Sequence, residues 1–303
     1  MTYTNAISIC ICTYNRWPQL EITLESLVES SSALGSDDEI IIIDNNSTDR
    51  TQQVVDRFAE KLPINYYFEP KQGLSVARNT ALAQSKNDGI VFFDDDVSIS
   101  SQALLTYKEV FTRRPEHCYF GGKISIIWPA AKPRWLKSDD LALLNGLFGY
   151  YSPADVDLVY DRQQNGPYGA NFALRRSLVN KVGNFNESLG VRGASIGRGE
   201  ETEYFQRAQN AGCTGLYCVN AAVGHRFQLD RISIPYLFRY GIEKGRAEFI
   251  LNHGCRNSWI ADSLTISLKA LFQLLKARRD RFYQCVINLG IVRGLYLATI
   301  QSD

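Results

Sequence analysis

The sequence predicts an α/β fold: a Rossmann-like, mostly parallel sheet with helices on both faces, followed by a C-terminal helical segment. Two observations favour this fold class. Strand and helix patterns alternate four times within residues 1–96, and each strand is a nearly continuous apolar run. Parallel strands joined by crossover helices are buried on both faces, which is why such strands lack the alternating pattern of half-exposed ones.

The individual elements can be placed by their apolar periodicity. Buried strands are expected at residues 7–12, 39–43, 64–68 and 90–93. Helical spacing predicts helices over residues 19–30, after the capping residues 47–48, and over residues 73–86. Shorter strands at residues 118–127 and 172–174 are expected to complete the sheet, beside a long loop over residues 128–136.

Composition limits the class of protein. The 303-residue chain is 45% hydrophobic and 21% charged, as expected for a soluble globular protein with a substantial core. Its net charge of +1 argues against a nucleic acid partner. Seven cysteines without a CxxC pattern suit reduced thiols in a cytoplasm. Neither a signal peptide nor an apolar run of about 18 residues is found, so a cytoplasmic protein without a spanning helix is expected.

Three consecutive aspartates, Asp94, Asp95 and Asp96, end the fourth predicted strand. Like charges this close are costly unless a cation lies among them, and carboxylate oxygens suit Mg²⁺ or Mn²⁺. Side chains two residues apart on a strand point to the same side, so Asp94 and Asp96 are expected to face one ion. A solvated acidic turn is the alternative for the triplet taken alone.

Other polar residues follow the carboxyl ends of the remaining strands. Thr13 to Arg16 come after the first strand, Asp44 comes after the second, and Arg78 lies in the helix before the fourth. Open α/β sheets bind ligands at this edge, so a nucleotide site is expected there. Arg78 would pair with a phosphate or with the aspartates. Because no GxGxxG motif follows the first strand, a metal on the aspartates would have to hold the phosphates.

A second acidic cluster, Glu200-Glu201-Thr202-Glu203, opens a predicted helix. Acidic residues at a helix N-terminus commonly offset the helix dipole, and this is the simplest interpretation. The functional alternative is a general base. The dipole would keep such a carboxylate ionised, whereas burial in a closed cleft would raise its pKa.

Six stretches in the same order resemble family 2 glycosyltransferases of the GT-A fold, over about residues 6–228. They are ICICTYNR (9–16), IDNNSTD (43–49), GLSVARN (73–79), FDDD (93–96), GNFNE (183–187) and GEETE (199–203). The resemblance implies an inverting transfer of a sugar from a nucleotide sugar, usually UDP-linked, with Mg²⁺ or Mn²⁺. It implies a saccharide or lipid-linked saccharide as acceptor, in polysaccharide or cell-surface glycan synthesis.

The resemblance also implies roles for residues on the donor side. Thr13, Asn15 and Arg16 would help to hold the nucleotide sugar, with Asp44 near its base or ribose and Arg78 close to the nucleotide. Asp94 and Asp96 would form the DxD pair that meets the metal and the diphosphate, with Asp96 in direct contact with the metal. Asp95 would face the sugar or the nucleotide.

Two further positions are implied for catalysis and metal binding. Glu201 stands where the family often has the aspartate that acts as base, and Glu200 is the alternative base. His225 stands where relatives often carry a histidine, which implies contact with the metal or the diphosphate. A purely structural histidine after a strand is the alternative for that residue.

The acceptor side is expected in the middle of the chain. Tyr168 and Asn171 are candidates, together with an aromatic group that comprises Trp128, Trp135, Phe148, Tyr150 and Tyr151. Trp135 is the best single candidate because it lies in a polar loop. Aromatic residues are also common in cores, so core packing is the alternative for the group.

The expected domains are a nucleotide-sugar-binding catalytic domain over residues 1–230 and a helical segment over residues 231–303. Leucine-rich stretches with interleaved arginine and lysine characterise the helical segment. Such stretches suit packing on the catalytic domain, a contact in a homo-oligomer, or peripheral contact with the cytoplasmic face of a membrane.

Three other classes of protein share parts of this pattern. A phosphatase or phosphotransferase of the haloacid dehalogenase type also has an Asp-x-Asp motif, but after its first strand. A sugar-nucleotide nucleotidyltransferase would usually carry a glycine-rich basic loop after the first strand, and none is present. A non-catalytic carbohydrate-binding protein is less favoured, since both acidic clusters are present.

Overall fold

The computed structural model describes residues 6–129, 145–160, 166–193, 197–251 and 279–302. The chain divides into two compact units. Unit 1 comprises residues 1–127, 151–188 and 200–226, and unit 2 comprises residues 128–150, 189–199 and 227–303. Unit 2 therefore takes in two segments that lie within the expected catalytic domain, residues 1–230. The assignment of functions to residues 1–230 and 231–303 stays a prediction.

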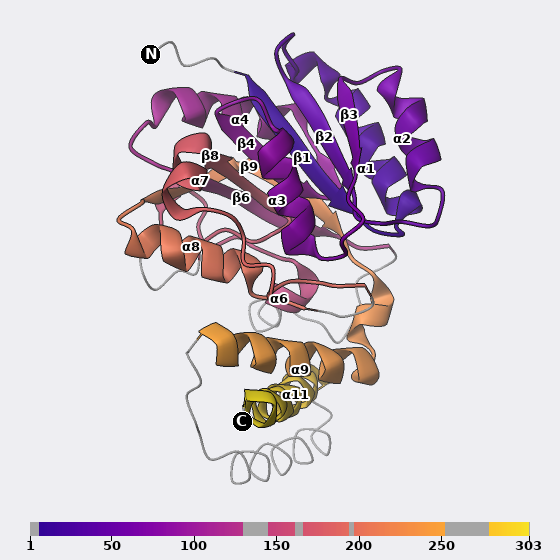
Figure 1. Ribbon diagram of the computed structural model, residues 1–303, viewed down its shortest axis with the longest axis vertical. Coiled ribbons are helices and arrows are strands. Elements are labelled where there is room, and N and C mark those ends of the chain that lie inside the picture. Colours follow the sequence, from indigo (N-terminus) through magenta and orange to yellow (C-terminus); the bar gives the residue numbers. More distant parts are fainter. Residues whose placement is uncertain (1–5, 130–144, 161–165, 194–196, 252–278, 303) are drawn as a thin grey trace. The chain divides into compact units, whose positions relative to one another are not determined.

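Unit 1 is built on a mixed sheet (Figure 1). Within the described residues its strand order is β3-β2-β1-β4-β8-β6-β9-β5, and β7 pairs with β9. The predicted parallel strands are β1 (Ile7–Thr13), β2 (Glu39–Asp44), β3 (Ile64–Phe68) and β4 (Gly89–Asp94). The others are β5 (Val97–Ile99), β6 (Tyr119–Ile127), β7 (Leu158–Val159), β8 (Asn171–Arg175) and β9 (Gly215–Arg226). Strand β8 runs antiparallel to both β4 and β6, and β6 runs parallel to β9.

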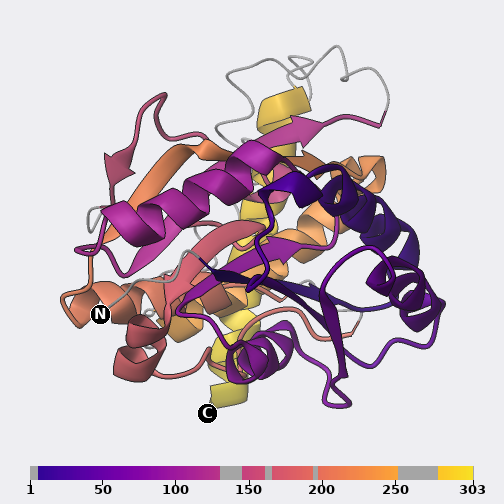
Figure 2. The same cartoon turned by 90° about the horizontal axis from the view of Figure 1, so that it is seen from above.

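Helices cover both faces of this sheet, as the sequence predicts (Figure 2). One face packs against α1 (Trp17–Glu29), α2 (Thr51–Ala59) and α4 (Ser101–Arg113). The other packs against α3 (Leu74–Gln84), α7 (Arg176–Val182) and α8 (Glu200–Asn210). On β1, Ile9 and Ile11 belong to the first core and Cys10 to the second, which is why the strand is apolar throughout.

The order of the first four strands places a topological switch point between β1 and β4. The chain runs outward from β1 to β2 and β3, and then returns to the other side of β1 as β4. Cys12 on β1 lies opposite Asp94 on β4, so the loop after β1 and the aspartates meet at one edge. Open α/β sheets bind ligands at this position.

The aspartate triplet does not continue the strand, contrary to the sequence-based expectation. β4 ends at Asp94, Asp95 and Asp96 form a turn, and β5 begins at Val97. The turn rotates the chain, so the rule that residues two apart share one side of a strand does not apply here.

Unit 2 contains α6 (Asn145–Phe148), the 3₁₀ helix η2 (Leu229–Ile232), α9 (Ile234–Leu251) and α11 (Arg279–Ser302). Another 3₁₀ helix, η1 (Ser31–Ala33), follows α1 in unit 1. Trp128 and Phe148 pack with Phe227 in unit 2, with ring centroids 4.9–5.8 Å apart. Two aromatic residues of the predicted acceptor group therefore contribute to a core cluster.

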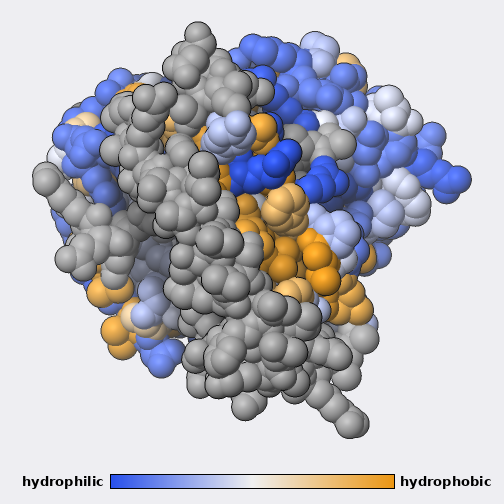
Figure 3. All heavy atoms as spheres, turned by 90° about the horizontal axis from the view of Figure 1, so that it is seen from below, coloured by the Kyte–Doolittle hydropathy of each residue, from blue (hydrophilic) through white to orange (hydrophobic). Residues whose placement is uncertain are grey.

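Apolar side chains also reach the molecular surface in unit 2, in part on the face seen in Figure 3. Exposed ones include Ile234 and Ile250 on α9 and Tyr296 on α11. In the part of the chain that the structure describes, we find no helix with the length and apolarity needed to span a membrane. The leucine-rich stretch over residues 264–275 lies outside the described residues. Each cysteine in the described ranges is a free thiol.

Candidate active site

A buried cluster of charged side chains joins the loops after β1 and β4. Asp95 is 3% exposed; it accepts a hydrogen bond from Thr13 Oγ1 (2.7 Å) and pairs with Arg16 Nη1 (2.7 Å). Asp96 is 1% exposed and pairs with Arg16 Nη2 at 2.6 Å. The structure thus brings together four predicted donor-site residues, and Arg16 bridges two of the three aspartates.

Asp94 and His225 lie beside this cluster. Asp94 is half-buried, and no hydrogen bond or ion pair joins its carboxylate to another described residue. His225 lies on β9 opposite Val97, and its Nε2 is 3.4 Å from Asp96 Oδ1. The predicted contact of His225 with the acidic triplet therefore has a geometric basis, while its contact with a metal stays a prediction.

The acidic triplet carries more negative charge than Arg16 offsets. Burial raises the pKa of Asp95 to about 7, although Arg16 opposes this shift, and the charge of Asp96 adds to it. Burial and the charge of Asp96 also raise the pKa of Asp94. A cationic ligand at this edge would relieve that repulsion.

The oxygen donors suit a hard divalent cation that shares its coordination with a substrate. Among the residues described, no three His, Cys, Asp or Glu side chains form a preassembled metal site. Mg²⁺ and similar ions commonly bind through one or two carboxylates and complete their coordination with substrate phosphates. Asp94, whose carboxylate has no hydrogen bond or ion pair with another described residue, and Asp96, which faces His225, fit such a two-carboxylate site.

The loops after β1 and β2 are tied together by polar contacts. Asp44 is buried; its carboxylate accepts hydrogen bonds from Ser47 N (2.8 Å) and Tyr66 Oη (2.9 Å). Asn15 has a φ of 51°; its backbone N–H donates to Ser47 Oγ, and its Oδ1 accepts from Thr48 N. Both residues thus shape the edge. Each oxygen of Asp44 keeps a lone pair for a ligand, so its predicted base or ribose contact remains open.

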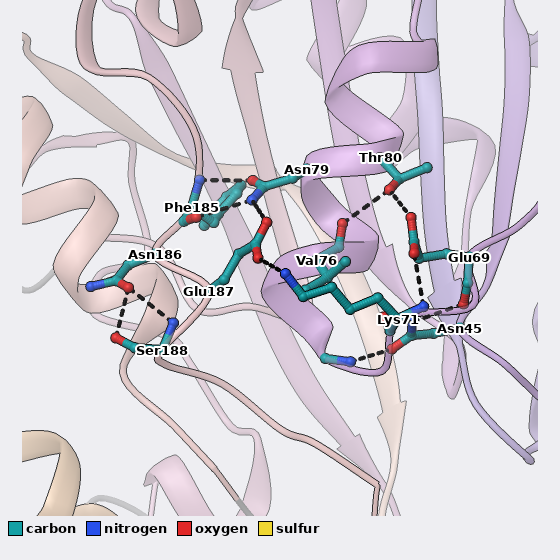
Figure 4. A network of polar contacts seen from close by, with 11 residues as sticks. Asn45, Glu69, Lys71, Val76, Asn79, Thr80, Phe185, Asn186, Glu187 and Ser188 are labelled. Carbon is teal, nitrogen blue, oxygen red and sulfur yellow. Dashed lines mark hydrogen bonds and ion pairs between the residues drawn. The ribbon is translucent and has the colours of Figure 1, made fainter.

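Asn45 anchors the loop after β3, a role that the sequence analysis did not assign. Its amide donates to the backbone oxygens of Glu69 and Lys71 and accepts from Gly73 N at 2.7 Å (Figure 4). This arrangement fixes the start of α3, the helix that carries Arg78 one turn later. In the sequence, the two adjacent asparagines in the stretch 44–47 were the feature that could have indicated this role.

A second set of contacts ties α3 to the loop over residues 183–188. Asn79 on α3 makes paired hydrogen bonds with the backbone of Phe185, and Lys71 pairs with Glu187 (Figure 4). These contacts hold the motifs at residues 73–79 and 183–187 side by side. Their sequence separation explains why periodicity alone could not pair them.

The second acidic cluster binds Arg78. Arg78 is 2% exposed; its Nη1 pairs with Glu200 Oε1 at 2.9 Å, and its Nη2 donates to the backbone oxygen of Gly169 at 3.3 Å. Its guanidinium lies over the rings of Phe172 and Phe185, 5.3 and 5.6 Å from their centroids. In this structure, therefore, Arg78 pairs with Glu200 and forms no ion pair with the aspartates.

Glu200 and Glu201 have different surroundings. Glu200 is buried, and burial together with the charge of Glu201 raises its pKa to about 8 against the effect of Arg78. Glu201 is partly exposed, and its Oε2 accepts no hydrogen bond from the described residues. A Cβ on Gly169 would lie 2.8 Å from Arg78 Nη2 and 3.5 Å from Glu201 Oε1. The absence of a side chain at Gly169 therefore leaves space for both Arg78 and Glu201.

The profile of the family "Glycosyl transferase family 2" matches residues 8–183. The chain belongs to this family. The glycosyltransferase is 28% identical over 303 residues to succinoglycan biosynthesis protein ExoM of Rhizobium meliloti, covering 95% of this chain and 92% of the relative. It is 35% identical over 107 residues to a Campylobacter jejuni GalNAc(5)-diNAcBac-PP-undecaprenol beta-1,3-glucosyltransferase, covering 33% of this chain and 32% of the relative.

Solved structures confirm the predicted GT-A fold of this glycosyltransferase. The mannosyltransferase PcManGT from Pyrobaculum calidifontis, in complex with GDP-Man and Mn²⁺, matches 96% of this chain and 87% of its own, with a TM-score of 0.63 and 15% identity. Residues 1–349 of S. aureus TarS, in complex with UDP-GlcNAc, match 96% of this chain and 91% of their own length, with a TM-score of 0.52 and 17% identity. Membership of the glycosyltransferase family sets aside the phosphatase, nucleotidyltransferase and non-enzyme alternatives.

Asn171 does not face an acceptor in the glycosyltransferase. It is fully buried; its Oδ1 accepts from Tyr107 Oη at 2.6 Å, and its Nδ2 donates to the backbone oxygens of Ala221 and Lys123. This side chain joins α4, β6, β8 and β9 inside the core. The polar character that suggested a sugar contact is satisfied by the protein itself.

The other predicted acceptor residues have different outcomes. Tyr168 is partly buried and packs on Tyr151, with ring centroids 4.5 Å apart. Trp135 lies outside the described residues. Contact of either residue with an acceptor sugar stays a prediction.

Replacement of Glu200 by glutamine is expected to weaken the pH dependence of stability. The folded pKa of Glu200, about 8, exceeds its ordinary value of 4.5, so between these values the folded state holds a proton that the unfolded chain has released. The stabilisation from that proton is lost as pH rises toward 8. We therefore expect the free energy of unfolding to fall less steeply in Glu200→Gln, by up to about 1.4 kcal/mol per pH unit.

Chemical denaturation at several pH values from about 5.5 to 7.5 measures this slope. Glu203→Gln is the matched control: it removes one carboxylate from the same helix, where Glu203 pairs with Arg207. An identical slope in Glu200→Gln and the wild type would contradict the proposed protonation of the buried Glu200.

Proposed function

We propose that this glycosyltransferase is a metal-dependent, inverting enzyme that moves a sugar from a nucleotide sugar, expected to be UDP-linked, to a saccharide or lipid-linked saccharide. One observation carries the proposal. Arg78 pairs with Glu200 and donates to the backbone oxygen of Gly169. The next residue, Ala170, accepts a hydrogen bond from the backbone N–H of Asp94, so the two acidic clusters meet at one short segment of unit 1. An inverting transfer needs two such groups, one at the leaving diphosphate and one at the attacking hydroxyl.

Asp94 and Asp96, with His225 beside them, would hold the divalent cation. When bound, Mg²⁺ or Mn²⁺ supplies charge stabilisation for the departing diphosphate. The Mn²⁺ in the structures of PcManGT with GDP-Man and of GalNAc-T7 with UDP and GalNAc supports a divalent ion without selecting between the two metals.

Glu201 is the proposed base. Its carboxylate takes the proton of the acceptor hydroxyl as that oxygen forms a bond to the anomeric carbon of the donor. The bond from the anomeric carbon to the diphosphate oxygen breaks on the opposite face, and the nucleoside diphosphate leaves with the electron pair. The configuration at that carbon is therefore inverted. Glu200 is buried and pairs with Arg78, whereas Glu201 is partly exposed as a residue and its buried Oε2 accepts no hydrogen bond from the described residues, which favours Glu201 for this role.

The protein's own groups prepare the donor side. Thr13 and Arg16 fix Asp95 and Asp96 in one arrangement, so the acidic turn does not have to reorganise when a diphosphate arrives. Asp44 has spare acceptor capacity toward a base or ribose.

The acceptor side of the proposal rests on the relatives. ExoM is a succinoglycan biosynthesis protein, and the Campylobacter enzyme is named for an undecaprenol-linked saccharide. Both names support a role in glycan synthesis on a saccharide or lipid-linked saccharide. With a lipid-linked acceptor, peripheral membrane contact through residues 231–303 stays one proposal for that segment, and a homo-oligomer contact is the other.

Ligand-dependent stabilisation tests the donor proposal. Thermal unfolding would be followed with UDP and with GDP, each alone and with Mn²⁺ or Mg²⁺. A nucleoside diphosphate at about 100 times its Kd is expected to stabilise the fold by about 2.7 kcal/mol, or several degrees, only when a divalent ion is present. Equal stabilisation without any divalent ion would contradict metal dependence. Stabilisation by GDP but not by UDP would contradict the proposed UDP-linked donor.

A further inference from the structure

Two buried carboxyl oxygens at the start of α8 have no hydrogen-bond donor among the described residues. Glu200 uses its Oε1 to accept from Arg78 Nη1 at 2.9 Å, but its Oε2 is buried and accepts no such bond. The Oε2 of Glu201 is buried and lacks a donor in the same way. Buried polar atoms are normally hydrogen-bonded, so two orphaned oxygens on consecutive residues indicate a missing donor.

The two carboxyl groups lie within hydrogen-bonding reach of one another. Burial and the charge of Glu201 raise the pKa of Glu200 to about 8, and a hydrogen bond between the two side chains adds to this shift. Two ionised carboxylates can only accept, whereas a protonated carboxyl group has one O–H donor. A single proton on the pair would therefore supply the missing donor.

The balance of charge around Arg78 favours the same arrangement. Arg78 is 2% exposed, and it lies between Glu200 and the space beside Gly169, which Glu201 Oε1 also borders. One guanidinium from α3 thus serves two carboxyl groups on α8, all within unit 1. With both carboxyl groups ionised this set would carry a net negative charge, and one proton makes it neutral. Buried charge is costly unless it is balanced.

We propose that Glu200 is a positioning residue: its protonated carboxyl group accepts from Arg78 and donates its O–H to Glu201, so the two form one acid–carboxylate pair with a single negative charge. The inference rests on the proposed function, because it takes Glu201 as the base. The bond from Glu200 holds one oxygen of Glu201 and leaves the other to take the proton of the acceptor hydroxyl. After transfer the pair holds two protons, and loss of one to water restores it. Glu200 touches no reacting atom.

Infrared difference spectra test the shared proton without any turnover. The full-length wild type minus Glu200→Gln should show the C=O band of a protonated carboxyl group, which disappears with a midpoint near the pKa of about 8. When the same pair of proteins also carries Glu201→Gln, that midpoint should fall by at least about 1 pH unit, because a neighbouring negative charge is gone. Absence of the band at about pH 7, or an unchanged midpoint with Glu201→Gln, would overturn the proposal.

Two variants of Glu200 separate a donor to the base from a merely structural side chain. Glu200→Gln keeps a neutral donor toward Glu201, whereas Glu200→Met keeps similar bulk and has none. We expect the kcat of Glu200→Met to lie about 10- to 100-fold below that of Glu200→Gln, with donor KM values within about twofold of each other.

The pH profile gives a second readout. In the wild type, kcat/KM for the acceptor should fall as pH rises through about 8, because Glu200 then loses its proton, and this fall should be absent in Glu200→Gln. Glu203→Gln is the matched control, since it changes another glutamate of α8, which pairs with Arg207, and it should keep the fall.

Equal kcat values in Glu200→Gln and Glu200→Met would overturn the proposal, as would an alkaline fall that persists unchanged in Glu200→Gln. If Glu200→Met fails to fold, the infrared band and the pH profile of Glu200→Gln decide. Because the infrared measurement needs no turnover, a wild type that transfers no sugar would count against the proposed function alone.

Discussion

Asp96→Asn is expected to lower the kcat for sugar transfer by at least about 1,000-fold. Asp96 is 1% exposed, pairs with Arg16 and faces His225, so it lies at the centre of the acidic turn. Asparagine keeps the shape of the side chain and removes its charge. The loss would combine weaker binding of a divalent cation with weaker stabilisation of the leaving diphosphate, effects worth about 100- to 1,000-fold each in comparable sites. Steady-state transfer assays at saturating donor measure it.

The matched control is Asp56→Asn, the same chemical change at an exposed position on α2. Its kcat should equal that of the wild type. The thermal midpoint of Asp96→Asn, measured without ligand, would show whether the fold survives, since Arg16 keeps Asp95 as a partner. A folded Asp96→Asn protein with more than about a tenth of wild-type kcat would contradict the placement of the leaving group at this turn.

Glu201→Gln is expected to lower kcat by about 100- to 10,000-fold while donor binding stays near wild type. Glutamine cannot take the proton of the acceptor hydroxyl, and positioned bases contribute effects of this size. The donor contacts are expected at the aspartate turn, so the stabilisation by a nucleoside diphosphate with Mn²⁺ should be retained. A split between lost turnover and retained binding is the signature of a group that acts in the transition state.

Two comparisons sharpen the Glu201 experiment. Glu201→Asp restores a base at the position where the family often has aspartate, and it should recover part of the activity. Glu200→Gln tests the neighbouring carboxylate, which pairs with Arg78. Near-normal kcat in Glu201→Gln together with a large loss in Glu200→Gln would reverse the assignment of the base.

The first half of the fold could be predicted from the sequence. β1 to β4 are apolar on both faces and are separated by helices with a clear apolar stripe, so local patterns alone give their type and order. The observed strand β3 spans Ile64–Phe68, the same residues as the prediction, and α8 begins at the predicted Glu200. The motif resemblance then supplied the GT-A fold and the family.

The side-chain partners at the site could not be predicted in the same way. Arg78 and Glu200 are 122 residues apart, and no local pattern pairs them. Three aspartates after an apolar run are compatible both with a strand that continues and with a turn. The sequence therefore did not reveal that the chain turns at Asp95 and Asp96. Asn171 is a polar residue between aromatic ones, a pattern that suggested a sugar contact. Only the structure reveals that its side chain is buried.

Close backbone approaches were also hidden in the sequence. Gly169 leaves space for Arg78 and Glu201, and the paired glycines of α9 and α11 bring two helices into contact. A glycine in a sequence signals a turn, a bulge or a close approach, and the choice depends on a neighbour that is distant along the chain.

The anomeric configuration of the product tests the central claim most directly. Wild-type protein with Mn²⁺, a nucleotide-sugar donor and a saccharide acceptor would be followed by NMR, with nucleoside diphosphate release measured in parallel. The account predicts a single displacement, and therefore a new glycosidic bond whose configuration is opposite to that of the donor, formed by the wild type and not by Asp96→Asn or Glu201→Gln. A product that retains the donor configuration would contradict it.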